Sequence, residues 1–127
     1  MGKNPLTKNK IEIMNFENPI FVSAVLIGPI FIIAGILLFK FPPKKINHLY
    51  GYRTKRSMED EEKWCFSQKY SAKLMIVFGG IYSLILLILT NFKISETIGL
   101  ILSIGLMLLL CFGTYFFTEN KLKNKNI

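Results

Sequence analysis

The stretch PIFVSAVLIGPIFIIAGILLF, residues 19–39, contains no charged side chain. At about 1.5 Å of rise per residue, a helix of this length crosses the roughly 30 Å hydrocarbon core of a bilayer. Two similar stretches follow, LMIVFGGIYSLILLILTNF at residues 74–92 and TIGLILSIGLMLLLCFGTYFFT at residues 97–118. Three such stretches in 127 residues leave too few polar residues to cover them in a water-soluble fold. The sequence therefore predicts an all-α integral membrane protein with three transmembrane helices.

The composition agrees with a membrane protein and argues against most classes of enzyme. Hydrophobic residues make up 51% of the chain, and 16 Lys and Arg against 8 Asp and Glu give a formal net charge of +8. With two cysteines and one histidine, His48, the chain offers no disulfide framework and no zinc site. The acidic run at residues 59–62 is a poor catalytic or metal cluster, because consecutive carboxylates on a helix point in different directions. We expect no enzymatic activity, no metal and no cofactor.

The distribution of positive charge predicts the orientation of the chain in the membrane. The tail before the first span and the connection between the second and third spans together hold four Lys and Arg residues. The loop between the first two spans, residues 40–73, and the C-terminal tail together hold twelve. With three spans these two sets lie on opposite faces, and Lys and Arg are retained on the cytoplasmic side. We expect the N-terminus outside, and the loop and the C-terminus in the cytoplasm.

Two polar tails flank the predicted membrane domain, residues 19–118. The N-terminal tail, residues 1–18, mixes lysines with apolar residues, a composition that also occurs in interfacial helices. Pattern and length do not decide between an interfacial helix and an extended tail. The C-terminal tail, residues 119–127, is rich in lysine and asparagine and is expected to be a solvated anchor next to the membrane.

The interior of the predicted spans contains no Asp, Glu, Lys, Arg or His. An ion carrier or a proton relay normally needs such a residue at membrane depth, so the sequence does not favour a transport pathway. Pro29 removes a helical hydrogen bond and predicts a kink in the first span. Small residues four positions apart would permit close helix contacts, and the pairs are Ala24 with Gly28, Gly79 with Ser83, and Gly99 with Ser103.

The loop between the first two spans combines a turn with an apparent helix start. Gly51 lies between Tyr50 and Tyr52, so a tight turn with positive φ is expected at a level where tyrosine rings suit the headgroup layer. Ser57 precedes Met58 and acidic residues, a pattern typical of a helix N-terminus. We therefore expect a juxtamembrane helix that begins near Met58, before the second span.

Arg53 has two possible roles in this loop. It would act as a membrane anchor by pairing with anionic lipid, a contact that contributes about 1 kcal/mol near the surface. Alternatively, its planar guanidinium would hold a carboxylate among residues 59–62, or the backbone carbonyls of a partner. The physical argument alone favours the anchor. The basic character of the loop does not indicate nucleic-acid binding, because no nucleic-acid-binding motif accompanies it.

The order of residues in this loop resembles the signature of the SdpI family of membrane immunity proteins. The signature begins with the run Asn47-x-x-Tyr50-Gly51-Tyr52-Arg53-Thr54. This run is followed by Ser57 and Met58, an acidic residue, and Trp64. The resemblance covers residues 19–117. Lys55 stands where the family often has proline, and Gln68 where an asparagine commonly follows the tryptophan. The positions that the resemblance marks as a site for a partner or toxin are Asn47, Tyr50, Gly51, Tyr52, Arg53, Thr54 and Trp64.

The resemblance implies an all-helical protein of the bacterial plasma membrane. The founding member of the family protects its producer from a secreted toxic peptide. With toxin bound, it also holds a cytoplasmic repressor at the membrane. The present chain is similar to one three-span half of that larger six-span member. Either two copies pair to rebuild the larger unit, or the second half of that member contributes functions that this chain lacks.

The sequence predicts one leading function and leaves two alternatives open. The leading prediction is a bacterial immunity or resistance protein that binds a membrane-active toxic peptide or shields its target. The second is a signalling receptor that recruits a cytoplasmic transcriptional regulator, and the third is an accessory subunit of a transporter. The expected partners are the lipid bilayer, a toxic peptide, a regulator protein and a second copy of the chain, with no direct binding of nucleic acid.

Overall fold

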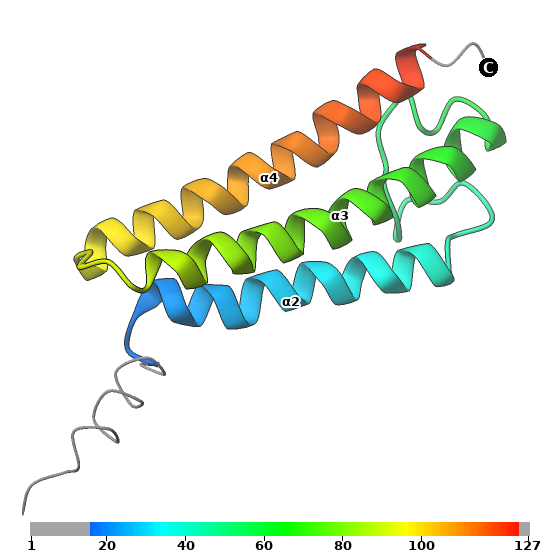
Figure 1. The fold of residues 1–127 in the computed structure, drawn as a ribbon. Coiled ribbons are helices and arrows are strands. Elements are labelled where there is room, and N and C mark those ends of the chain that lie inside the picture. Colours follow the sequence, from blue (N-terminus) through cyan, green and yellow to red (C-terminus); the bar gives the residue numbers. More distant parts are fainter. Residues whose placement is uncertain (1–15, 125–127) are drawn as a thin grey trace, which may run out of the picture.

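The structure is a computed structural model that describes residues 16–124, which form three long helices (Figure 1). Helix α2 spans Pro19–Lys40, helix α3 spans Glu61–Leu89 and helix α4 spans Glu96–Asn124. In Figure 1, α3 lies between α2 and α4, and the long α2–α3 loop, residues 41–60, closes one end of the bundle. The question of an interfacial helix in the N-terminal tail falls largely outside the described residues. So do the last three residues of the C-terminal tail.

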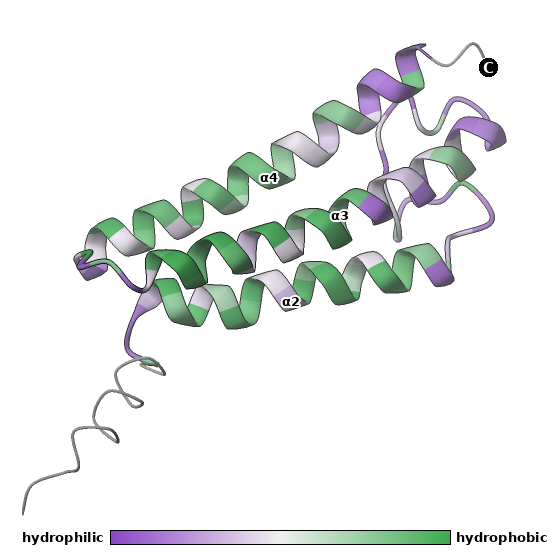
Figure 2. Ribbon diagram, in the orientation of Figure 1, coloured by the Kyte–Doolittle hydropathy of each residue, from purple (hydrophilic) through white to green (hydrophobic). Residues whose placement is uncertain are grey.

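All three helices are long and apolar enough to cross a membrane, which supports the predicted multi-pass architecture. Figure 2 shows apolar residues along the middle of each helix and polar residues gathered at the end that carries the α2–α3 loop. The first helix matches its predicted span. Helices α3 and α4 extend beyond theirs, to Glu61 at the start and to Asn124 at the end. Helical hydrogen bonds also form in polar sequence, so a helix can continue beyond its charge-free run. The charge-free run therefore marks the part of the helix suited to the bilayer and not the ends of the helix.

The prediction of a separate juxtamembrane helix from Met58 is not supported. Helix α3 begins three residues later and runs without interruption into the second span. Its N-cap is Asp60, whose carboxylate accepts a hydrogen bond of 2.7 Å from the backbone N–H of Lys63. The acidic residues do occupy the first turn of a helix, as expected, but the helix is α3 itself. Ser57 resembled an N-cap in the sequence, because serine and aspartate side chains both accept hydrogen bonds from the unpaired backbone N–H groups of the first helical turn.

Small residues allow α2 and α3 to approach closely, as the sequence predicted. A Cβ atom at Gly28 would lie 2.9 Å from the carbonyl oxygen of Gly79, and would also collide with the Ser83 hydroxyl. That hydroxyl donates a 2.7 Å hydrogen bond to the carbonyl of Ala24. Glycine at the crossing of α2 and α3 therefore sets the distance between the two backbones.

Helix α2 passes through Pro29 as one continuous helix.

Helix α4 packs less extensively, with most of its apolar side chains directed outward. Near its start, a Cβ at Gly99 would lie 2.8 Å from the side chain of Ile20, so this glycine also marks a close contact. The Tyr82 hydroxyl of α3 donates a hydrogen bond of 3.1 Å to the carbonyl of Ser103. The outward-facing apolar residues are in the position expected for contact with lipid acyl chains.

Candidate functional site

Asn47 organises a turn in the α2–α3 loop. The Oδ1 atom of Asn47 accepts hydrogen bonds from the backbone N–H groups of Leu49 at 2.9 Å and Tyr50 at 2.8 Å. Its Nδ2 atom donates to the carbonyl of Lys45 at 3.0 Å. Asparagine favours such turns because its short side chain reaches backbone groups two or three residues away. The sidechain of this predicted site residue thus shapes the loop backbone.

Gly51 forms the turn that the sequence predicted, with φ of 102°. It is the residue with positive φ among those described, and L-residues with a side chain rarely adopt this conformation. A Cβ at this position would collide with Oε1 of Gln68 and would lie 2.9 Å from Cγ of Pro43. Both the dihedral angle and the lack of space therefore require glycine here.

Gln68 of α3 clamps the loop through the backbone of Tyr52. Its Oε1 accepts from the Tyr52 N–H at 2.7 Å, and its Nε2 donates to the Tyr52 carbonyl at 2.8 Å. The Gln68 side chain is completely buried. In the sequence, Gln68 stood out only as a departure from the family pattern. A buried amide is costly unless both of its ends are paired, and here the loop backbone pairs both.

Trp64 anchors the other side of the same loop. Its ring is fully buried, and its indole Nε1 donates a hydrogen bond of 2.7 Å to the carbonyl of Pro43. A buried tryptophan normally needs such a partner for its N–H group. Trp64 and Gln68 lie one helical turn apart on α3, so one face of the helix holds both Pro43 and Tyr52.

Tyr50 and Arg53 lie on the exposed side of the loop. The Tyr50 hydroxyl donates to the carbonyl of Phe41 at 3.1 Å, and the Arg53 guanidinium donates to the carbonyl of His48. Of the alternatives left open for Arg53, an ion pair with a carboxylate at residues 59–62 is not seen among the described residues. The carbonyl that Arg53 binds belongs to its own loop. The side chain remains exposed, as an anchor to lipid requires.

Thr54 and Ser57 form a compact reciprocal turn. The Thr54 N–H donates to the Ser57 hydroxyl at 2.8 Å, and the Ser57 N–H donates to the Thr54 hydroxyl at 3.1 Å. The Ser57 hydroxyl donates in turn to the Thr54 carbonyl at 2.9 Å. Ser57 is fully buried. Its hydroxyl is therefore engaged inside the loop, which is the physical reason why Ser57 does not cap α3.

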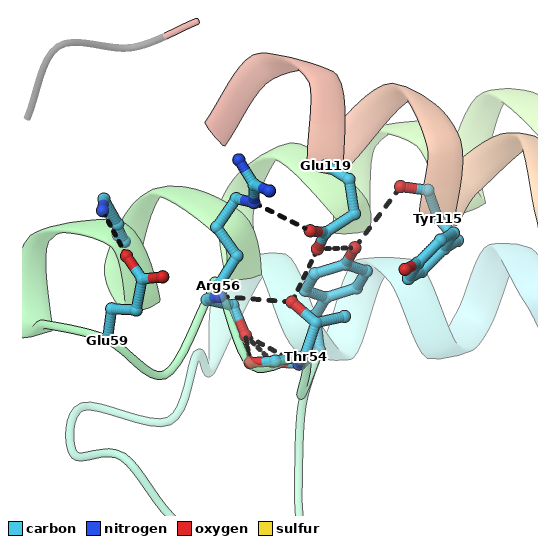
Figure 3. A network of polar contacts seen from close by, with 8 residues as sticks. Thr54, Arg56, Glu59, Tyr115 and Glu119 are labelled. Atoms are coloured by element: carbon cyan, nitrogen blue, oxygen red, sulfur yellow. Dashed lines mark hydrogen bonds and ion pairs between the residues drawn. The ribbon is translucent and has the colours of Figure 1, made fainter. Parts of the chain in front are cut away.

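Glu119 of α4 joins the loop to the third helix (Figure 3). Its Oε1 accepts hydrogen bonds from the hydroxyls of Tyr52 at 2.7 Å and Thr54 at 2.6 Å. Its Oε2 lies 3.4 Å from Nε of Arg56. Burial, and then the bond to Glu119, raise the pKa of the Tyr52 phenol far above its usual value. From its position in the sequence, Glu119 was predicted to lie in a solvated tail. A lone acidic residue directly after a span was the available signal.

Below the loop, the three helices enclose a partly open cavity of about 340 Å³. Its walls are largely apolar, and the turn at residues 50–52 forms its roof. The wall residues that matter below are Ala34 and Leu38 of α2, Met75 of α3 and Thr114 of α4. Among residues 16–124, no group of three or more His, Cys, Asp or Glu side chains is placed to hold a metal ion.

These features define a class: a helical, multi-pass membrane protein in which an ordered polar loop closes one end of a three-helix bundle. The model of the SdpI/YfhL protein family matches residues 44–118. A similar relative, "Uncharacterized protein YfhL" of Bacillus subtilis (strain 168), is 44% identical over 97 residues, or 76% of this chain and 82% of that protein. No solved structure matches. The chain belongs to the SdpI/YfhL family, and the matched region contains all seven predicted site residues.

Proposed function

We propose that the protein is a bacterial membrane immunity protein that protects against a membrane-active toxic peptide and catalyses no reaction. Membership of the SdpI/YfhL family supports an immunity-type function. The observation that carries the proposal is the fixed position of the loop. Gln68 holds the Tyr52 backbone, Trp64 holds Pro43, and Glu119 holds the Tyr52 side chain. A loop fixed at three points loses little conformational entropy when it binds a partner.

The hydroxyls at the loop are engaged in bonds that support binding better than catalysis. Those of Tyr50, Tyr52 and Thr54 donate to the backbone or to Glu119. A nucleophilic hydroxyl requires a neighbouring base that can take its proton. The Glu119 carboxylate, which accepts from the Tyr52 and Thr54 hydroxyls, is already paired with Arg56. These bonds fix the shape of the loop, and that shape is what a binding protein offers.

We place the protein in the plasma membrane of a bacterium with its N-terminus outside and the α2–α3 loop in the cytoplasm. The charge distribution supports this orientation. A peptide that inserts into the bilayer from outside would then reach the loop from within the membrane. Binding at the helix ends would capture the inserted peptide, or shield its target, before the bilayer is permeabilised.

Survival of a sensitive bacterium tests the proposal. Cells carrying empty vector, the wild-type chain, Gly51→Val or Gly80→Val are challenged with a panel of membrane-active peptides at matched membrane abundance. Gly51 requires positive φ, whereas a Cβ at Gly80 meets open space. We expect protection by the wild type and by Gly80→Val, and loss of protection by Gly51→Val. The proposal would be contradicted if the wild-type chain inserted into the membrane but protected against none of the peptides.

A signalling receptor is the second candidate, supported by the exposed basic residues of the loop. Lys44, Lys45, Arg53 and Lys55 are exposed and would present positive charge to an acidic face of a cytoplasmic regulator. Crosslinking in cells, with and without the protective peptide, distinguishes the two functions. A receptor requires a regulator that is captured only when the peptide is present, whereas a pure immunity protein protects cells that lack the regulator.

A further inference from the structure

The cavity below the loop lies where the apolar helices meet the polar loop, a position that corresponds to the boundary between acyl chains and headgroups if the three helices span a bilayer. Its walls come from the membrane-spanning parts of α2, α3 and α4, and its roof comes from the polar loop. Phe39 and Lys73 are close in sequence to the wall residues Leu38 and Met75. The Lys73 ammonium group lies 5.8 Å from the centre of the Phe39 ring, an arrangement typical of the membrane boundary. The cavity is therefore accessible to amphiphiles of the bilayer.

The roof of the cavity is next to positive charge. Pro43 lies against Gly51, since a Cβ at Gly51 would be 2.9 Å from Cγ of Pro43. Lys44 and Lys45 follow directly and are exposed. Among the basic residues at 40–60, Arg56 is the one whose ion pair with an acidic side chain is seen in the described part of the chain. An apolar cavity whose roof contacts Pro43, the residue directly before two exposed lysines, is complementary to an anionic amphiphile.

We propose that this cavity binds one acyl chain of an anionic phospholipid, with the lipid phosphate against Lys44 and Lys45. An apolar cavity left unfilled would forfeit dispersion contacts along Leu38 and Met75, and acyl chains are the abundant apolar groups at this depth. The phosphate adds charge-assisted contacts at the roof. This proposal holds whether or not the chain confers immunity, because it depends only on the cavity and the neighbouring charge.

Native mass spectrometry of the full-length protein in detergent tests the apolar part of the site. The probe is palmitoyl-oleoyl phosphatidylglycerol, and the variants are Thr114→Phe and Cys111→Phe. Thr114 lines the cavity, whereas Cys111 lies one turn earlier on α4 with its side chain exposed. We expect the fraction of chains that retain one lipid to fall about tenfold in Thr114→Phe and to stay at the wild-type level in Cys111→Phe.

The headgroup part is tested by competition with palmitoyl-oleoyl phosphatidylcholine, which has the same acyl chains. The wild type is expected to retain phosphatidylglycerol preferentially, and the double variant Lys44→Gln/Lys45→Gln to lose that preference. Met75→Trp replaces Thr114→Phe if circular dichroism shows that the latter has lost helix. Equal retention of the two lipids by the wild type, or full retention by the variants that fill the cavity, would overturn the proposal. The proposal would also be overturned if an apolar peptide displaced the lipid equally well from the wild type and from the variants whose cavity is filled.

Discussion

The Tyr52 hydroxyl donates a hydrogen bond of 2.7 Å to the carboxylate of Glu119, which lies 67 positions further along the chain. This bond connects the loop at one end of α2 to the last turns of α4, a helix that otherwise packs loosely. Thr54 and Arg56 contact the same carboxylate. Glu119 therefore holds together the end of the bundle at which the candidate site lies.

Removal of this carboxylate is expected to cost more than removal of its cationic partner. Glu119→Ala leaves the Thr54 hydroxyl without its acceptor and the Tyr52 hydroxyl with only the 3.4 Å contact to the Tyr115 carbonyl, and is predicted to reduce the free energy of unfolding by about 2–3 kcal/mol. Arg56→Ala is predicted to cost less than about 1 kcal/mol, because the Arg56 side chain is 40% exposed and solvent screens the pair. Thermal unfolding in detergent, followed by the fluorescence of Trp64, measures both. Equal costs would show that the ion pair, and not the hydroxyl bonds, is the main contribution.

The Tyr52 phenol gives the loop a predicted response to alkaline pH. Its pKa is raised in the folded protein by burial and by Glu119, whereas an unfolded tyrosine ionises near pH 10. The unfolded chain therefore releases this proton first as the pH rises. The stability contributed by Tyr52 is complete below about pH 10 and decreases above it. Wild type and Tyr52→Phe are compared by thermal unfolding from pH 8 to pH 11, and the stability difference between them should shrink above pH 10. Parallel curves would contradict this assignment.

The three spans and the glycine turn could be predicted from sequence because each depends on a local property. A charge-free run reports membrane burial directly, and Gly51 between two tyrosines reports a turn. The contacts of Glu119 and Gln68 depend instead on which helix ends lie together. No local pattern encodes that arrangement. The helix predicted to begin near Met58, with Ser57 as its cap, was misplaced for a related reason. A tertiary turn with Thr54 uses the Ser57 hydroxyl that local reasoning had assigned to a cap.

Gln68 is predicted to control the order of the loop. Gln68→Leu keeps the side chain similar in size but leaves the Tyr52 N–H without its partner, and leaves the Tyr52 carbonyl with only the 3.4 Å bond from the Ser57 hydroxyl. We expect the free energy of unfolding to fall by about 1–3 kcal/mol, the cost of leaving one buried polar group unpaired and weakening the pairing of a second. Hydrogen exchange of the Tyr52 amide, measured by mass spectrometry of a peptide that covers the loop, should become faster. Exchange at wild-type rates would show that Trp64 and Glu119 hold the loop without Gln68.

The crossing of α2 and α3 provides a pair of identical substitutions with opposite expected effects. Gly28→Ala places a Cβ against the Ser83 hydroxyl and the Gly79 carbonyl, whereas Gly105→Ala places one in open space on α4. Alanine favours helix over glycine by up to about 1 kcal/mol, so Gly105→Ala should be neutral or stabilising. Gly28→Ala should instead be destabilised by about 1–3 kcal/mol, because the helices must separate. Thermal unfolding of the two variants under the same detergent conditions decides the matter. If both raise the unfolding temperature, Gly28 does not set the separation of the helices.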